Sequence, residues 1–434
     1  MKKNVLFVST GSLAFGESVM ALNFARSLPK SDYNSCFILS PLNSVLLEQD
    51  NEEFENVKLF EGAHKINRLL VIDFLEKNPP DIIVLCDFLT FDFSQADFGI
   101  NLKFLRAYGK PIISLDTYEW ESGNFTLDFF SGVDKQLPRM LLQLDGALRP
   151  CPLNKPAPTT ERIVCYSFLD QIKCLQPDEI ERKREELGIN PNDFVIFSAT
   201  AVWQAFRPKT KYKGPFGHIV SELLSYYVSK LNKPVHWIRV GPERERTTEK
   251  YGNITEHNFP SLQESEFDKL LAASDILVTS NVASTTLVKC IKYGRSALLL
   301  YNSIKANQPS DLAQYKHIKL SEYMSKLIEN AYPLQPFLMF PLGWYKFLSP
   351  IMKDNPYLET FYRAEILDEE VVLSILHQAI QDKELSLSKE VGNYEKLLKT
   401  LPSPSESIEH FINQHNRQVR METKDENSEH TLNR

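Results

Sequence analysis

Short, largely apolar runs alternate with helical patterns along the first part of the chain. Runs typical of buried parallel strands occupy residues 5–8, 35–39, 57–60, 82–86 and 112–115. Apolar positions recur at helical spacing in residues 17–28, 67–77 and 102–108. Strands that alternate with helices in this way predict a doubly wound parallel sheet of the α/β class.

The same alternation returns further along the chain and predicts a second sheet. Its strands are expected at residues 193–198, 235–240, 276–279 and 297–301, and its helices at residues 217–231, 264–273, 284–293 and 369–383. We therefore predict two tandem Rossmann-like doubly wound domains that face each other across a cleft, because ligands of such sheets bind at the carboxyl ends of the strands.

The prolines of residues 149–158 mark the approach to the domain boundary. Four prolines in ten residues are too many for a helix or a strand. We expect an N-terminal domain over residues 1–165 and a C-terminal domain over residues 166–385, followed by a helical segment over residues 386–415. Residues 416–434 are polar and poor in apolar groups, which predicts a disordered tail.

Composition narrows the class of protein. Of the 434 residues 43% are hydrophobic, which rules against wholesale disorder, and the formal net charge of -7 argues against a general nucleic-acid binder. The six cysteines contain no C-x-x-C pair, so the sequence indicates no metal knuckle. The chain shows no signal-peptide pattern and no apolar run long enough to span a bilayer, so we expect a cytoplasmic protein.

Residues 331–362 form an aromatic, proline-rich insertion in the second domain. Four prolines between residues 333 and 350 prevent a continuous helix. The segment 331–351 is the best candidate for a weak membrane or oligomer contact, or for contact with a large apolar acceptor. Packing of the insertion on its own domain is the alternative that we favour.

Glycines and carboxylates follow the strands of the first sheet. These loops and the start of the first helix contain Gly11, Ser12, Gly16, Glu17, Asp87 and Asp116. Because the carboxyl ends of parallel strands meet at one edge of a sheet, we expect a polar cluster there.

The corresponding loops of the second sheet carry groups that suit an anion. A hydroxyl-rich turn at residues 280–286 opens a helix, whose N–H groups and dipole favour a phosphate. Four cations lie in residues 207–213, and Arg207 is the candidate for neutralising a diphosphate, with a solvated loop as the alternative. The candidate ligand-binding residues of these loops are Thr200, Arg207, Gly241, Ser280, Asn281, Ser284, Thr285 and Thr286.

This order of strands, loops and helices resembles the GT-B glycosyltransferases. Their first loop often reads glycine-x-glycine-histidine, and Glu17 takes the place of the histidine here. The resemblance implies that Glu17 or Asp116 deprotonates the acceptor hydroxyl. Two alternatives stay open: Glu17 as a first-turn residue favoured by the helix dipole, and Asp116 as a cap for the following segment.

The donor half of the family pattern is altered in this chain. Phe259 lies in the short segment that the family places beside the nucleotide base, where backbone groups typically hold the base. Many relatives carry glycines where this chain has residues 280–286, and Lys289 replaces a glutamate that often contacts ribose. Lys289 either meets a phosphate or a carboxylated sugar, or the ribose contact is lost. The pair Asn307-Gln308 stands where the family often has an Asp-Gln pair that bonds to the donor sugar, unless it only forms a turn.

The resemblance implies transfer of a sugar from a nucleotide-diphosphate donor to a small-molecule, peptide or lipid-linked acceptor. The family generally needs no metal or other cofactor, and the absence of two spaced glutamates favours inversion at the anomeric carbon. Two alternatives use the same fold: a sugar-nucleotide epimerase or hydrolase, and a non-catalytic binding protein.

Overall fold

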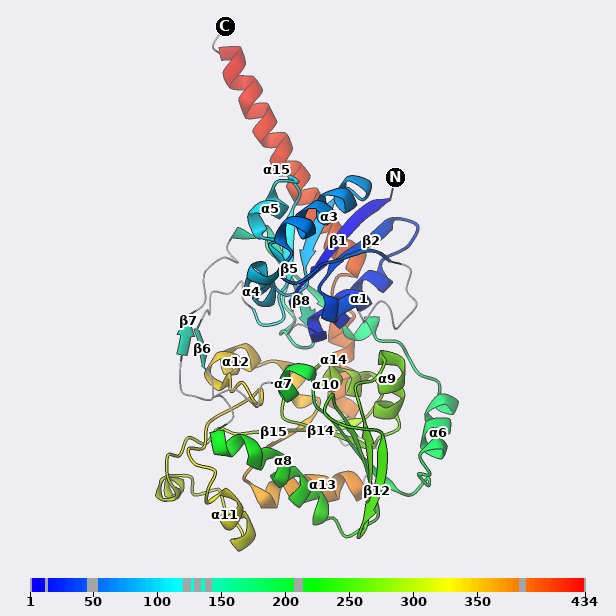
Figure 1. Cartoon of the computed structure of the whole chain (residues 1–434), viewed down its shortest axis with the longest axis vertical. Coiled ribbons are helices and arrows are strands. Elements are labelled where there is room, and N and C mark those ends of the chain that lie inside the picture. Colours follow the sequence, from blue (N-terminus) through cyan, green and yellow to red (C-terminus); the bar gives the residue numbers. More distant parts are fainter. Residues whose placement is uncertain are drawn as a thin grey trace. The chain divides into compact units, whose positions relative to one another are not determined.

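The chain folds into two compact units, which we describe from a computed structural model. The structure describes residues 2–11, 15–44, 54–119, 126–128, 134–136, 143–206, 214–381 and 388–432. One unit comprises residues 1–124, 138–171 and 397–434, and the other comprises residues 125–137 and 172–396. Figure 1 shows both units and labels many of their helices and strands.

The first unit contains a seven-stranded parallel sheet in the order β3-β2-β1-β4-β5-β8-β9. Its strands are β1 (Lys3–Ser9), β2 (Tyr33–Leu39), β3 (Glu55–Lys58), β4 (Ile82–Leu85), β5 (Ile112–Leu115), β8 (Gly146–Cys151) and β9 (Ile163–Ser167). Its helices are α1 (Phe15–Ser27), α3 (His64–Lys77), α4 (Phe88–Phe98), α5 (Leu102–Arg106) and α15 (Pro404–Leu432). Aromatic contacts hold α1 on the sheet, since the Phe24 ring lies 6.2 Å from that of Phe7 and 5.0 Å from that of Tyr166.

The second unit contains another seven-stranded sheet, in the order β12-β13-β11-β10-β14-β15-β16. Its strands are β10 (Phe194–Ala199), β11 (Val235–Val240), β12 (Thr247–Tyr251), β13 (Ile254–Phe259), β14 (Ile276–Thr279), β15 (Ser296–Tyr301) and β16 (Tyr362–Glu365). All neighbours pair in parallel except the exposed edge strand β12, which is antiparallel to β13. The prediction of two doubly wound sheets is therefore confirmed.

Helices cover the second sheet on both faces. The helices of this unit are α6 (Pro177–Glu186), α7 (Val202–Phe206), α8 (Gly214–Ser229), α9 (Glu264–Ala272), α10 (Thr285–Lys292), α11 (Glu322–Ile328), α12 (Tyr345–Met352), α13 (Glu369–Gln381) and α14 (Ser388–Leu398). A small hairpin, β6 (Thr126–Asp128) with β7 (Asp134–Gln136), also belongs to this unit.

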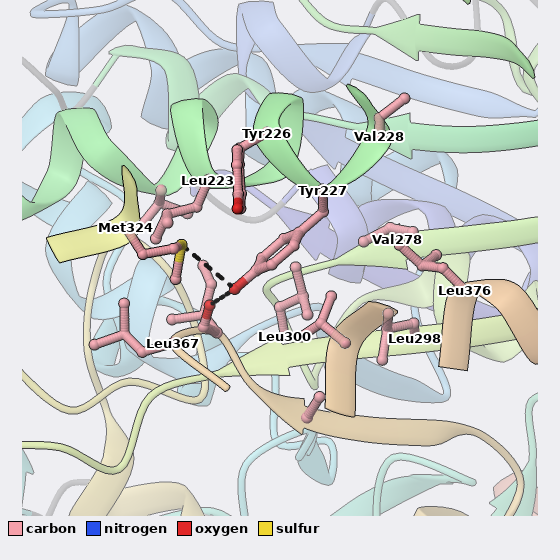
Figure 2. Close-up of a cluster of buried hydrophobic side chains, with 14 of the residues drawn as sticks. Leu223, Tyr226, Tyr227, Val228, Val278, Leu298, Leu300, Met324, Leu367 and Leu376 are labelled. Atoms are coloured by element: carbon pink, nitrogen blue, oxygen red, sulfur yellow. Dashed lines mark hydrogen bonds between the residues drawn. The ribbon is translucent and has the colours of Figure 1, made fainter. Parts of the chain in front are cut away.

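One large apolar core lies between this sheet and helices α8, α11 and α13. Figure 2 shows Tyr227 of α8 pointing its hydroxyl toward Met324 of α11. The hydroxyl also donates to the Ile366 carbonyl at 2.5 Å, so this large buried ring leaves no unsatisfied polar tip. On the other face, the Phe197 ring of β10 meets the Phe267 ring of α9 at 5.3 Å.

The proline-rich segment corrects one prediction. Residues 149–151, which we expected to form neither helix nor strand, complete β8. Neighbouring β5 pairs with β8 only as far as Leu148, so beyond that point β8 has β9 as its one partner in the sheet. A proline at position 150 therefore removes no hydrogen bond that a second neighbour would need.

The C-terminal tail corrects another prediction. Residues 416–432 continue α15 as a helix instead of forming a disordered tail. A capping arrangement starts this helix, since the Ser403 N–H donates to Glu406 Oε2 at 2.8 Å and the Glu406 N–H donates to Ser403 Oγ at 3.3 Å. Residues 404–432 contain no glycine and no proline after the first position, so nothing in the sequence terminates the helix once it has started. The grouping of residues 397–434 with the first unit also differs from the sequential boundaries that we expected.

The insertion packs on its own domain, which was the favoured alternative. Leu334 and Phe337 are fully buried in the core of the second unit. None of the described helices is both long and apolar enough to cross a membrane.

Candidate functional site

Each sheet has one point where the strand order reverses. In the first unit it lies between β1 and β4, and in the second between β10 and β14. Open α/β sheets bind ligands outside the carboxyl ends of the strands at such switch points. The candidate residues fall beside these two points, because Gly11 and Asp87 follow β1 and β4, while Thr200 and Ser280 follow β10 and β14. Ser12 and Arg207 lie outside the described residues.

Buried polar side chains fix the end of β1 and the two residues that follow it. Ser9 Oγ lies 2.5 Å from Ser18 Oγ of α1, and Thr10 Oγ1 lies 2.7 Å from Ser94 Oγ of α4. The fully buried Asn43 amide donates to Ser9 Oγ at 3.0 Å and to the Gly11 carbonyl at 3.1 Å. These bonds hold residues 9–11 between α1 and α4.

Glu17 stands at the centre of the cluster. It lies in the first turn of α1, half-buried, and the Tyr118 hydroxyl donates to its Oε1 at 3.2 Å. Burial and the neighbouring Asp87 carboxylate raise the pKa of Glu17 to about 8, against opposing hydrogen bonds. The same burial and the two carboxylates raise the pKa of Tyr118 well above its usual value. The structure therefore gives Glu17 a carboxyl group that changes charge close to neutral pH.

Asp87 and Asp116 have different surroundings. Asp87 caps α4, accepting the Thr90 N–H at 2.7 Å on Oδ2. Asp116 is fully buried and accepts a hydrogen bond from Arg149 Nε at 3.1 Å. Asp116 thus has no exposed surface and is already paired with a buried guanidinium, whereas Glu17 is half-exposed. We therefore assign Asp116 to the positioning of Arg149 and favour Glu17 as the candidate base.

Two residues of this cluster were missed by sequence reasoning. Tyr118 lies two positions after Asp116 in the same loop, and Arg149 lies in the proline-rich segment that we did not expect to be a strand. In the sequence, the one available signal for Tyr118 was a tyrosine three positions after a predicted strand. No sequence pattern links Arg149 to Asp116, because β5 and β8 become neighbours only in the folded sheet.

The two glycines of the first loop are not equivalent. A Cβ atom at Gly11 would lie 2.1 Å from Thr90 Oγ1 and 2.3 Å from Thr90 Cβ, whereas a Cβ at Gly16 meets nothing within 4 Å. We expect Gly11→Ala to cost about 1–3 kcal/mol because the first turn of α4 must move. Gly16→Ala lies in a helix and should stabilise the protein by about 0.5–1 kcal/mol.

Urea unfolding of the two glycine variants checks this difference. Thr90→Gly should restore much of the stability of Gly11→Ala, since it removes the side chain that the new methyl group meets. Equal stability of the two single variants would contradict the close approach of Gly11 to α4.

In the second unit, backbone bonds join the ends of three strands. The Thr200 N–H donates to the Val240 carbonyl at 2.8 Å, and the Gly241 N–H donates to the Phe259 carbonyl at 3.0 Å. The Phe259 ring is buried, and the Arg246 guanidinium lies over it at 5.0 Å. Because the Phe259 side chain is buried, a ligand at the ends of these strands can approach only the backbone of this residue.

The hydroxyl turn, residues 280–286, leads from β14 into α10. Ser284 is the N-cap of this helix and accepts the Thr286 N–H at 3.2 Å on its hydroxyl. Asn281 is buried, and its Oδ1 accepts the Ala283 N–H at 3.0 Å. Thr285 and Thr286 are half-exposed at the start of the helix.

Most backbone N–H groups of this turn already have acceptors within the chain. The acceptors are Thr279 Oγ1 for Asn281, the Leu338 carbonyl for Val282, Asn281 Oδ1 for Ala283, the Asn281 carbonyl for Ser284, Ser284 Oγ for Thr286 and the Ser284 carbonyl for Leu287. Among the described residues we find no acceptor for the Thr285 N–H. An anion at this turn would therefore be bound by hydroxyls and by Thr285 unless some of these bonds open.

Lys289 does not face the hydroxyl turn as a free cation. Its ammonium lies 2.7 Å from Glu264 Oε1 and 2.7 Å from Asp268 Oδ1, both on α9, and the residue is only 4% exposed. Tyr293 also donates to Asp268, at 2.8 Å. Burial lowers the pKa of Lys289, but the two carboxylates outweigh this and raise it above its usual value. The expected contact of Lys289 with a phosphate or sugar is replaced by a buried ion cluster between α9 and α10.

Asn307 and Gln308 lie in an exposed turn before a short 3-10 helix, η5 (Pro309–Gln314). Asp311 Oδ2 accepts the Asn307 N–H at 2.8 Å and the Gln308 N–H at 3.2 Å. The capping arrangement agrees with the turn-forming alternative for this pair. It leaves both side chains on the surface, where a sugar could reach them.

Comparison with models of protein families shows which family the chain belongs to. Residues 24–416 match the model of DUF6365, described as a family of unknown function. The chain belongs to this family. A search of curated protein sequences found no match.

Comparison with solved structures identifies the fold. Spinosyn forosaminyltransferase SpnP is 12% identical, with a TM-score of 0.54 over 96% of this chain and 99% of its own. Spinosyn rhamnosyltransferase SpnG, complexed with spinosyn aglycone, is 11% identical, with a TM-score of 0.51 over 93% of this chain and 98% of its own. At such identities the similarity shows the fold alone, and it confirms the GT-B architecture of this DUF6365 protein.

Proposed function

We propose that this DUF6365 protein is a glycosyltransferase that moves a sugar from a nucleotide-diphosphate donor to an acceptor hydroxyl. The position of the half-buried Glu17 carboxyl group beside the switch point of the first sheet, hydrogen-bonded by Tyr118 and with a raised pKa, is the observation that carries the proposal. A carboxylate with a pKa near the working pH is an efficient general base. The GT-B fold adds support, since the solved structures with this fold that we compared are glycosyltransferases by name.

In the proposed reaction Glu17 takes the proton of the acceptor hydroxyl while the acceptor oxygen forms a bond to the anomeric carbon. The bond from that carbon to the donor diphosphate breaks, and the nucleoside diphosphate leaves with the electron pair. Attack on the face opposite the leaving group inverts the anomeric configuration. Tyr118, hydrogen-bonded to Glu17, orients the carboxylate, and burial together with Asp87 keeps the pKa of Glu17 high.

The second unit is proposed to bind the donor. The hydroxyl groups of Ser284, Thr285 and Thr286 at the start of α10 would donate to the diphosphate, where the helix dipole also favours negative charge. Asn307 and Gln308 remain the candidates for the sugar hydroxyls. The proposed chemistry uses no metal ion or other cofactor.

A panel of nucleotide sugars and nucleoside diphosphates tests the proposal by thermal shift and native mass spectrometry. We expect at least one nucleoside diphosphate to raise the unfolding midpoint, because a ligand that binds only the folded state stabilises it. Ser284→Ala should reduce this nucleotide-dependent shift, while the exposed Ser325→Ala on α11 should preserve it.

Two outcomes decide against the proposal. If no nucleotide stabilises the wild-type chain or binds in the mass spectrometer, the donor site is absent and a non-catalytic role is favoured. If a bound nucleotide sugar is hydrolysed or epimerised without any acceptor, the chain is a sugar-nucleotide epimerase or hydrolase instead.

A further inference from the structure

Part of the aromatic insertion lies directly against the hydroxyl turn. We define the covering segment as residues 338–344. The Phe340 N–H donates to the Ser280 carbonyl at 2.9 Å, and the Val282 N–H donates to the Leu338 carbonyl at 3.0 Å. Asn281 and Met339 form an antiparallel bridge between these two bonds. The covering segment thus pairs with the hydroxyl turn like an added strand.

A side chain from the other side of the switch point holds the same segment. Gln204 of α7, the helix after β10, donates from Nε2 to the Phe340 carbonyl at 2.8 Å. Its Oε1 accepts the Ala201 N–H at 2.9 Å, which fixes the amide in this orientation. Phe340 therefore bridges the loops that follow β10 and β14, the two strands between which the sheet order reverses.

The segment folds as a tight turn that is anchored at its far end. The Leu338 N–H donates to the Gly343 carbonyl at 3.0 Å, and Gly343 has a φ of 94°, which other residues rarely adopt. The next residue, Trp344, donates its N–H to the Asp128 carbonyl at 2.9 Å. Asp128 Oδ1 also accepts the Phe347 N–H, at 2.9 Å, so the β6–β7 hairpin caps α12.

These contacts occupy the Val282 N–H, a backbone donor of the hydroxyl turn that a diphosphate at the switch point would use. We propose that the covering segment is an autoinhibitory lid, which a nucleoside diphosphate must displace to reach this N–H. The inference rests on the proposed donor site. If the site is open in only a fraction of the molecules, the apparent Kd equals the Kd of the open form divided by that fraction. The lid therefore sets the apparent affinity for the donor.

The lid can be loosened at two independent places. Gln204→Ala removes the bond to the Phe340 carbonyl, and Gly343→Ala disfavours the tight turn. Loss of one hydrogen bond of ordinary strength should raise the open fraction, and tighten binding of the nucleoside diphosphate found in the panel, by about 2- to 10-fold. Gln314→Ala, an exposed glutamine of η5, is the matched control and should leave affinity unchanged.

Hydrogen exchange and calorimetry on the full chain test the lid together. We expect faster exchange at the Val282 and Phe340 amides in both variants, and lower Kd values by calorimetry. Unchanged exchange at these amides would overturn the inference. Faster exchange with equal or weaker binding would also overturn it, because the segment would then be part of the donor site.

The two proposals fail differently. Equal nucleotide affinity in the wild type and both loosened variants leaves the donor site intact and removes only the lid. Absence of nucleotide binding in every variant, including those with faster exchange, overturns the donor site and the lid with it.

Discussion

Glu17→Gln should lower kcat/KM for sugar transfer by about 100- to 10,000-fold, the usual contribution of a general base. The glutamine keeps the size of the side chain and can still accept the Tyr118 hydrogen bond, but it cannot take up the acceptor proton. Steady-state rates with the donor identified by the nucleotide panel measure the effect. Glu61→Gln, on an exposed residue of the same unit, is the control and should retain full activity.

The pH dependence of the wild type provides a second measurement on the same group. A base must be ionised to act, so kcat/KM should rise with pH and level off above the Glu17 pKa of about 8. Folding raises this pKa, so the folded state is favoured while the carboxyl group is protonated. This contribution to the free energy of unfolding is complete below the unfolded-state pKa of 4.5 and is lost as the pH rises to the folded-state pKa of about 8. Glu17→Gln should then be more stable than wild type above pH 8, by roughly 1–3 kcal/mol for this half-buried group. Full activity in the variant, or no gain in stability at high pH, would contradict the role of Glu17.

The sheets and the positions of the loops were predictable because burial on both faces leaves a local signal. The strands around Val84 and Leu298 are short, continuous apolar runs, and parallel order then places their following loops at one edge. That reasoning brought Glu17 and Asp87 together correctly. The orientation of Glu17 toward Tyr118 was not predictable, because the two residues lie far apart in the sequence.

The donor side shows where sequence reasoning stops. The hydroxyl turn was located correctly at the start of α10, but its pairing with the covering segment depends on a bridge between Asn281 and Met339 that no local pattern encodes. An isolated pair of backbone hydrogen bonds carries no periodicity, unlike a strand. The structure explains why this turn contains no glycine. The turn is held against another segment, and its residues do not adopt the positive φ values that favour glycine.

Lys289 illustrates a different limit. A lysine in a helix was taken as a candidate ligand for phosphate, whereas its partners are two carboxylates on the preceding helix. Glu264 and Asp268 are four residues apart and therefore share one face of α9, which was a usable signal for a cation on a packed neighbour. Only the packing of α9 against α10 shows which cation it is.

Lys289→Ala should destabilise the second unit by about 3–5 kcal/mol, as expected when one partner of a buried ion cluster is removed. Asp268 would keep its charge in a buried site, and burial already raises the pKa of this carboxyl while Lys289 lowers it. Chemical denaturation followed by tryptophan fluorescence, which reports on the fully buried Trp237, measures the loss. Lys292→Ala, in the last turn of the same helix, is the matched control and should change stability by less than about 0.5 kcal/mol.

The pH dependence of the Lys289→Ala loss separates an ion cluster from simple packing. Without the lysine, the folded-state pKa of Asp268 rises further, so the stability of the variant is greatest at low pH and is lost as pH rises through that value. The difference from wild type should therefore be smaller at pH 5 than at pH 8. Asp268→Asn combined with Lys289→Met should recover part of the loss, because the uncompensated charge is gone while the apolar stem is kept. A loss of equal size at both pH values, with no recovery in the double variant, would mean that packing around the lysine stem, not its charge, holds α9 and α10 together.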